Sequence, residues 1–101
     1  MSLEQEFTRA LEGTVAAAKA RHYYTTYFMQ MLGEHGGVET ARRLMASREP
    51  QLGLFELYRL DLLHESMEAV VLQEKFRSLF TPEELAEAHR RLDELGYFKK
   101  S

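Results

Sequence analysis

The stretch over residues 62–73, LLHESMEAVVLQ, gathers residue types that take part in catalysis. His64 is a potential base, Ser66 a potential nucleophile, and Glu65 and Glu68 are carboxylates. A zinc protease motif would need a second histidine four residues after His64, but position 68 is glutamate. A serine nucleophile usually lies on a strained turn between glycines, which Ser66 lacks. We therefore interpret the stretch as a helix start.

In this interpretation Ser66 is the N-cap of a helix that begins at Met67. Glu68 is then an early acid that favours the helix dipole and pairs with a nearby arginine. A small hydrolase around His64, Glu65 and Glu68 is the third-ranked hypothesis for function.

The composition describes one soluble globular domain over residues 1–101. Apolar residues make up 45% of the chain and charged residues 29%. The chain has no cysteine, which excludes disulfides, thiolate zinc sites and cysteine nucleophiles. Its four histidines show no metal-like spacing, so we expect neither a metal nor a cofactor. The net charge of −3 argues against a general polyanion binder.

The first residues carry acids and no basic segment followed by an apolar run, so we expect no signal peptide. No apolar stretch approaches the roughly 20 residues that span a bilayer. We therefore expect a cytoplasmic protein that does not enter a membrane.

Apolar residues spaced three and four apart predict an all-α fold without a sheet, a compact bundle of about five to six helices. We expect a first helix over about residues 3–22. Thr25 or Thr26 caps a second helix, which stops at Gly36-Gly37. These glycines follow His35, but an esterase-type oxyanion loop would need a preceding strand.

The second half of the chain predicts further helices. The third runs over residues 38–47 and ends at the loop of Arg48, Glu49 and Pro50. The most apolar segment, residues 51–63, predicts a central, mostly buried helix. Thr81-Pro82-Glu83-Glu84 is typical of a capped helix start, and Gly96 closes that last helix.

Four aromatic residues lie close together at positions 23–28. Tyr24 and Phe28 share a helical face with Met31 and Leu32, and we expect this face in the core. Tyr23 and Tyr27 remain on another face, one turn apart. Because tyrosine is enriched at interfaces, these two residues are candidates for contact with another protein or a second copy of the chain.

The basic residues have acidic neighbours along the helices, and most of them, including Arg90-Arg91, predict solvated faces. Arg42, Arg43 and Arg48 form a candidate anion or nucleic-acid patch if the helix ends meet. A nucleic-acid-associated accessory protein that uses these arginines is the second hypothesis, although the net charge opposes attraction to phosphate.

Residues 25–97 also carry a spaced pattern, GGVxTAxxL, SxEAxVLxxxFxxLFTxxE and RLxxxGY. With this pattern the chain resembles a family of small all-helical bacterial domains to which no activity is assigned. That family passes more directly from its Arg-Leu-Asp segment to Ser-x-Glu, whereas residues 62–65 intervene here, so no role carries over to Asp61 or His64. The resemblance implies a bacterial, cytoplasmic, helical protein and no mechanism. The first hypothesis is therefore a non-enzymatic helical interaction or regulatory module that binds another protein or itself.

Overall fold

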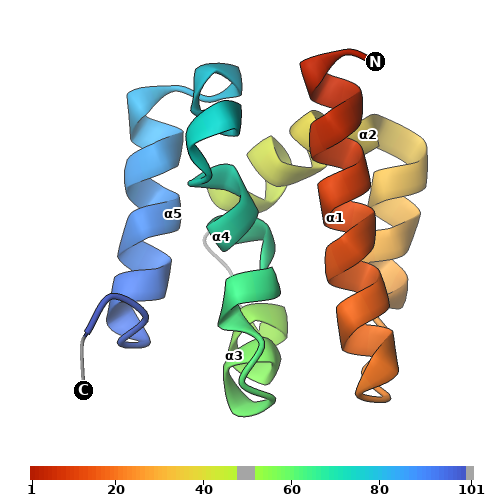
Figure 1. Ribbon diagram of the computed structural model, residues 1–101, viewed down its shortest axis with the longest axis vertical. Coiled ribbons are helices and arrows are strands. Elements are labelled where there is room, and N and C mark those ends of the chain that lie inside the picture. Colours follow the sequence, from red (N-terminus) through yellow and green to blue (C-terminus); the bar gives the residue numbers. More distant parts are fainter. Residues whose placement is uncertain (48–51, 100–101) are drawn as a thin grey trace.

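The computed structural model describes residues 1–47 and 52–99, and within these ranges every regular element is helical. The prediction of an all-α bundle is therefore confirmed (Figure 1). The elements are α1 (Leu3–Ala20), α2 (Thr26–Ala46), α3 (Leu52–Arg59), the 3₁₀ helix η1 (Leu63–Glu65), α4 (Met67–Val71), the 3₁₀ helix η2 (Glu74–Leu79) and α5 (Pro82–Glu94).

Local capping signals determine where α1 and α5 begin. The Thr81 hydroxyl accepts a hydrogen bond from the Glu84 amide, and the Glu84 carboxylate accepts one from the Thr81 amide. This reciprocal capping box, with Pro82 at the first helical position, confirms the predicted start of the last helix. Ser2 and Gln5 form a second capping box at the start of α1.

Three helical segments end in the same way, at a residue in the left-handed conformation. Gly96 has φ of 78° and closes α5, as predicted. His22 and Asp61 take the same conformation, with φ of 62° and 59°, after α1 and α3. In each case the amide of the next residue donates a hydrogen bond to the carbonyl five residues before it. The Tyr23 amide, for example, donates to the Ala18 carbonyl. Polar residues fill a position that glycine usually occupies, so α1 ends at Ala20 and α3 ends before Leu60.

Helix α2 is bent at Gly36, whose φ of 77° and ψ of 172° leave the helical region. The predicted stop at Gly36-Gly37 is confirmed, but a new helical segment follows at once and forms the second half of α2. Gly37 lies against α1, where its amide donates to the Thr8 hydroxyl at 3.0 Å. A Cβ at residue 37 would lie 2.8 Å from the Thr8 Cα, so only glycine permits this approach.

The central element is α4, a short helix whose Met67, Val70 and Val71 are buried. It contacts α1 on one side and α5 on the other, and η1 and η2 pack against its ends (Figure 1). The largest core cluster surrounds this helix. In it the Phe7 ring of α1 meets the edges of Phe76 and Phe80 at centroid distances of 5.2 and 5.1 Å.

The expectation that residues 51–63 form the central, mostly buried helix is wrong. Helix α3 has eight residues and lies at one end of the molecule (Figure 1). Its buried side chains are Leu54 and Leu57, and Leu54 joins a small cluster with Leu63 and Leu92. The other large apolar residues of α3 point outward, because a short helix that packs on one side can bury only one stripe.

Tyr24 was expected in the core and is 61% exposed, so that expectation is also wrong. Helix α2 begins only after Tyr24, which therefore does not share the helical face of Met31 and Leu32. Those two side chains are buried as expected. Thr25 is the N-cap residue, but its hydroxyl makes no capping bond, and its oxygen is buried without a partner in the described part of the chain.

Replacing Gly37 with alanine is expected to destabilise the protein by about 1–3 kcal/mol, because the new methyl group collides with backbone and side-chain atoms of Thr8. Gly33→Ala, in the same helix with open space around the new methyl group, is the matched control. It should stabilise the protein by up to about 1 kcal/mol. Urea unfolding of both variants measures the difference, and equal effects would contradict the close approach of α1 and α2.

Candidate functional site

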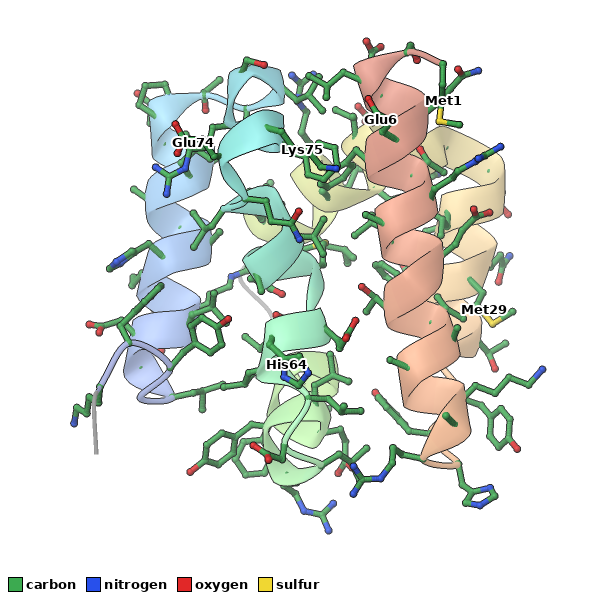
Figure 2. The ribbon with its side chains drawn as sticks, viewed as in Figure 1. Met1, Glu6, Met29, His64, Glu74 and Lys75 are labelled. Atoms are coloured by element: carbon green, nitrogen blue, oxygen red, sulfur yellow. The ribbon has the colours of Figure 1, made fainter. Side chains whose placement is uncertain are left out.

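The side chains of the 62–73 stretch do not converge on a common point. The Ser66 hydroxyl donates to the Leu63 carbonyl at 2.6 Å and accepts from the Ala69 amide at 3.2 Å, as a helix N-cap does. His64 is 60% exposed and lies 3.7 Å from Glu65 on the surface (Figure 2). Glu68 is buried at 4% exposure and pairs with α5 instead. The predicted cap is confirmed, and the geometry offers no serine–histidine pair.

The partner of Glu68 is Arg91, whose Nη1 lies 3.1 Å from the carboxylate. The predicted pairing of Glu68 with an arginine is therefore confirmed. Arg91 itself was expected on a solvated face and is only 3% exposed, so that expectation is wrong. Its neighbour Arg90 does lie at the surface, where it pairs with Glu87 and Glu94. The helical register turns one of two consecutive arginines inward.

Arg91 also closes the end of α2. Its Nη2 donates to the carbonyls of Leu44, Met45 and Ser47 at 2.9, 3.1 and 3.4 Å. The last carbonyls of a helix have no partner within the helix, and a guanidinium is well suited to bond several of them at once. One side chain of α5 therefore binds both the central helix and the end of α2.

The pKa values of the two carboxylates beside Arg91 are shifted in opposite directions. Burial raises the pKa of Glu68 above its ordinary value, while hydrogen bonds from its own amide and from Arg91 act in the other direction. For Glu87, the hydrogen bond from Arg90 is the largest effect and, with Arg91, lowers the pKa from 4.5 to about 2. The Arg91–Glu68 pair joins α5 to α4, whereas the bonds of Glu87 to Arg90 and Arg91 lie within α5.

The candidate arginine patch is paired with acidic residues where the structure describes it. Arg42 donates to the Leu79 carbonyl at 2.9 Å and lies 3.6 Å from Glu84. Arg43 bonds Glu39 at 2.9 Å. Arg48 lies outside the described residues. The two described arginines therefore carry compensated charges, which weakens the basis for phosphate contact.

The predicted interface tyrosines border a groove of about 670 Å³ between the start of α2 and α3. Tyr27 is 69% exposed at its rim. Tyr23 is half-buried, and desolvation, with a smaller contribution from the charge of Glu56, raises its pKa. Thr25 and Glu68 belong to its lining beside aromatic and aliphatic side chains, so the groove offers both apolar and polar contacts. The described residues that line it are Thr14, Tyr23–Phe28, Met31, Arg43, Leu44, Ser47, Leu52–Leu54, Leu57, Met67 and Glu68.

Helix α3 also carries a row of exposed apolar side chains, here called the ridge, and of these Leu52 lines the groove. The ridge consists of Leu52, Phe55 and Tyr58, which are 73%, 50% and 46% exposed. These residues recur every three positions and therefore lie on one side of the helix. The Phe55 and Tyr58 rings contact each other at a centroid distance of 6.0 Å. The ridge, together with Tyr24 and Tyr27, which line the groove with Leu52, makes up what we call the aromatic face.

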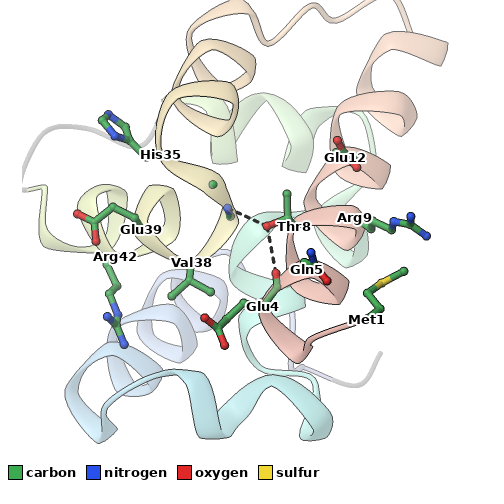
Figure 3. A pocket seen from close by; sticks show the side chains of 12 residues that line it. Met1, Glu4, Gln5, Thr8, Arg9, Glu12, His35, Val38, Glu39 and Arg42 are labelled. Atoms are coloured by element: carbon green, nitrogen blue, oxygen red, sulfur yellow. Dashed lines mark hydrogen bonds between the residues drawn. The ribbon is translucent and has the colours of Figure 1, made fainter.

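A second hollow, of about 760 Å³, lies between α1 and the bend of α2 (Figure 3). Figure 3 shows Thr8 at its base, where the hydroxyl donates to the Glu4 carbonyl and accepts from Gly37. Its charged lining mixes both signs: Glu4, Arg9, Glu12, Glu39 and Arg42. The hollow therefore selects for neither an anion nor a cation.

In residues 1–47 and 52–99, no three His, Asp or Glu side chains form a group that could hold a metal ion. The helices within the same ranges are too short or too polar to cross a bilayer. Comparison of the chain with models of protein families, with curated proteins and with solved structures finds no match. The resemblance of residues 25–97 to a helical bacterial family stays a prediction, and function is inferred from the geometry.

Arg91→Met is expected to cost about 3–5 kcal/mol of stability, because it leaves the Glu68 carboxylate buried without its partner. Arg90→Met, one residue away and at the surface, is the control and should cost much less than Arg91→Met, because its ion pairs are exposed to solvent. Combining Arg91→Met with Glu68→Leu should restore part of the loss, since no buried charge remains. Chemical denaturation measures all three. A double variant no more stable than the single one would contradict the role assigned to the pair.

The low pKa of Glu87 predicts a loss of stability in acid. A carboxyl group whose folded pKa of about 2 lies below its ordinary value of 4.5 stabilises the fold above about pH 5 and loses this contribution toward pH 2. Glu87→Gln lacks the contribution at every pH. The difference in unfolding free energy between wild type and variant should therefore be largest near neutral pH and shrink as the pH falls. Denaturation curves at several pH values would show a constant difference if the ion pairs were unimportant.

Proposed function

We propose that this protein is a non-enzymatic helical interaction module that binds another protein chain through the aromatic face. The observation that carries the proposal is the exposure of large apolar side chains at the groove and on the neighbouring ridge. Tyr27 and Leu52 are more than two-thirds exposed, and Phe55 is half exposed. A soluble domain of this size has a core in which such side chains could be buried, yet they face water.

The location of these residues supports an interface. The turn between α1 and α2, helix α3 and the end of α5 lie toward the same end of the molecule (Figure 1). Contiguous apolar patches rimmed by charged groups are typical of protein contact sites, and tyrosine and phenylalanine are enriched in them. The concave groove beside the ridge would accept an anchoring side chain of a partner.

The use of the polar groups also favours binding over catalysis. Ser66 caps α4, Glu68 holds Arg91, and Arg91 closes α2. Each of these groups would have to break a structural bond before it could act on a substrate. The expectation of a bacterial, cytoplasmic protein belongs to the same proposal and rests on the sequence pattern alone.

Affinity capture from a bacterial lysate, with and without nuclease treatment, tests the proposal. Wild-type protein should retain a partner that Tyr27→Ser with Phe55→Ser loses by at least about tenfold, because both anchors are removed. Met29→Ser is the matched control: Met29 is 51% exposed on α2 but does not line the groove (Figure 2). The control should retain the partner.

Two results would contradict the proposal. Equal capture by all three proteins would show that the aromatic face is not the binding surface. Capture that disappears after nuclease treatment would favour the nucleic-acid hypothesis, and Arg42→Glu with Arg43→Glu would then be the variant to examine.

A further inference from the structure

The groove between the start of α2 and α3 is lined in part by residues from the interior of the bundle. Its buried lining residues are Thr14, Met31, Leu54, Leu57, Met67 and Glu68. They belong to α1, α2, α3 and α4, so each of these helices contributes to one recess. The hollow beside the bend of α2 differs, because Gly37 is the only buried residue among the described residues that line it.

The size and the charges of the groove favour a small, neutral molecule. Its volume of about 670 Å³ is within the range of small-molecule sites, roughly 300–1,000 Å³. The charged side chains in its described lining are Arg43 and Glu68, and each already has a partner of opposite sign, Glu39 and Arg91 respectively. A charged molecule would therefore lose its water without gaining a free counter-charge.

The side chains of the lining favour an aromatic molecule. Four rings and two thioethers line the groove: Tyr23, Tyr24, Tyr27, Phe28, Met31 and Met67. Aromatic rings pair favourably with other rings, and methionine sulfur makes favourable contacts with ring edges. The Tyr23 side chain reaches from the turn before α2 to α3, since a Cβ at residue 53 would lie 3.5 Å from the Tyr23 hydroxyl.

One hydroxyl of the lining has no partner within the described part of the chain. Thr25 is the N-cap residue of α2, but its side chain makes no capping bond, and its Oγ1 is buried. A buried hydroxyl without a hydrogen bond destabilises the state that contains it. An oxygen of a bound molecule would accept the missing hydrogen bond, so the lining favours a molecule that carries such an oxygen.

We propose that the groove binds a small, neutral, aromatic molecule with a hydroxyl or carbonyl oxygen, and that the Thr25 hydroxyl donates a hydrogen bond to this oxygen. This site goes beyond the proposed function and does not depend on it. A bound molecule and a partner protein would share Tyr24, Tyr27 and Leu52, and would therefore exclude each other.

A titration of the purified full chain with 2-naphthol, a neutral phenol of two fused rings, tests the site. The readout is NMR of carbon-13-labelled methionine methyl groups. Met31 and Met67 line the groove, whereas Met1 and Met29 do not (Figure 2). The Met31 and Met67 signals should shift in a saturable way, because an aromatic ring in the groove changes the magnetic field at nearby methyl groups. Equal shifts of Met1 and Met29 would show unspecific adsorption and would overturn the site.

A charged relative of the probe tests the chemical class. 2-Naphthoate has the same rings and carries a carboxylate in place of the hydroxyl. It should bind at least about tenfold more weakly than 2-naphthol, because Arg43 is already bonded to Glu39 and offers no free positive charge. Equal or tighter binding of 2-naphthoate would overturn the assignment to neutral molecules.

Thr25→Val tests the hydrogen bond, because it removes the hydroxyl and keeps the shape of the side chain. The variant should bind 2-naphthol at least about fivefold more weakly than wild type does. It should bind naphthalene, which lacks the oxygen, as wild type does. Thr40→Val is the matched control, since the Thr40 hydroxyl is also buried without a partner in the described residues but does not line the groove. Equal binding of 2-naphthol by all three proteins would overturn the role of Thr25.

If 2-naphthol caused no saturable shift up to about 1 mM, where even weak binding of that Kd would be visible, the groove would not be a site for this class of molecule. The titration contains only the purified chain and small molecules, so this result would leave the proposed function untouched. The capture experiment with Tyr27 and Phe55 decides that proposal separately.

Discussion

The arrangement of the helices depends on one buried guanidinium. Arg91 of α5 bonds the Glu68 carboxylate of α4 and the last carbonyls of α2, which lie 44 to 47 residues away in the chain. Burying a charge is costly unless every hydrogen-bonding group around it is satisfied, so this contact tolerates only one relative placement of the three helices. Apolar packing around α4 supplies the driving force, and the contacts of Arg91 join α5 to α4 and to the end of α2.

The same requirement explains why the polar residues of the central stretch look catalytic in the sequence. A short helix at the centre of a small bundle needs its first amides and its early carboxylate satisfied without water. Ser66 and Glu68 meet these needs. The proposed interaction surface is apolar instead, and it includes α3, a helix at the periphery of the core.

Features set by neighbouring residues could be predicted from the sequence. The all-α fold, the caps at Ser66 and Thr81 and the break at Gly36 follow from signals within four residues. Features set by distant partners could not. The peripheral position of α3 and the burial of Arg91 depend on contacts far along the chain, and Asp61 ends its segment in a conformation that usually indicates glycine. Within the candidate site, the exposure of Tyr27 could be predicted from helical spacing. The exposed apolar row on α3 could not, because its exposure depends on where α3 packs.

Arg91 comes later in the chain than the helices that it binds, α2 and α4, and this order affects folding during synthesis. While the ribosome has released only α1 to α4, the Glu68 carboxylate has no counter-charge and the end of α2 lacks its cap. The nascent chain can form local helices during this time, but it cannot complete its core. The ridge on α3 and the unfinished core are then exposed together. This part of the fold is therefore expected to be completed only after residue 91 has emerged.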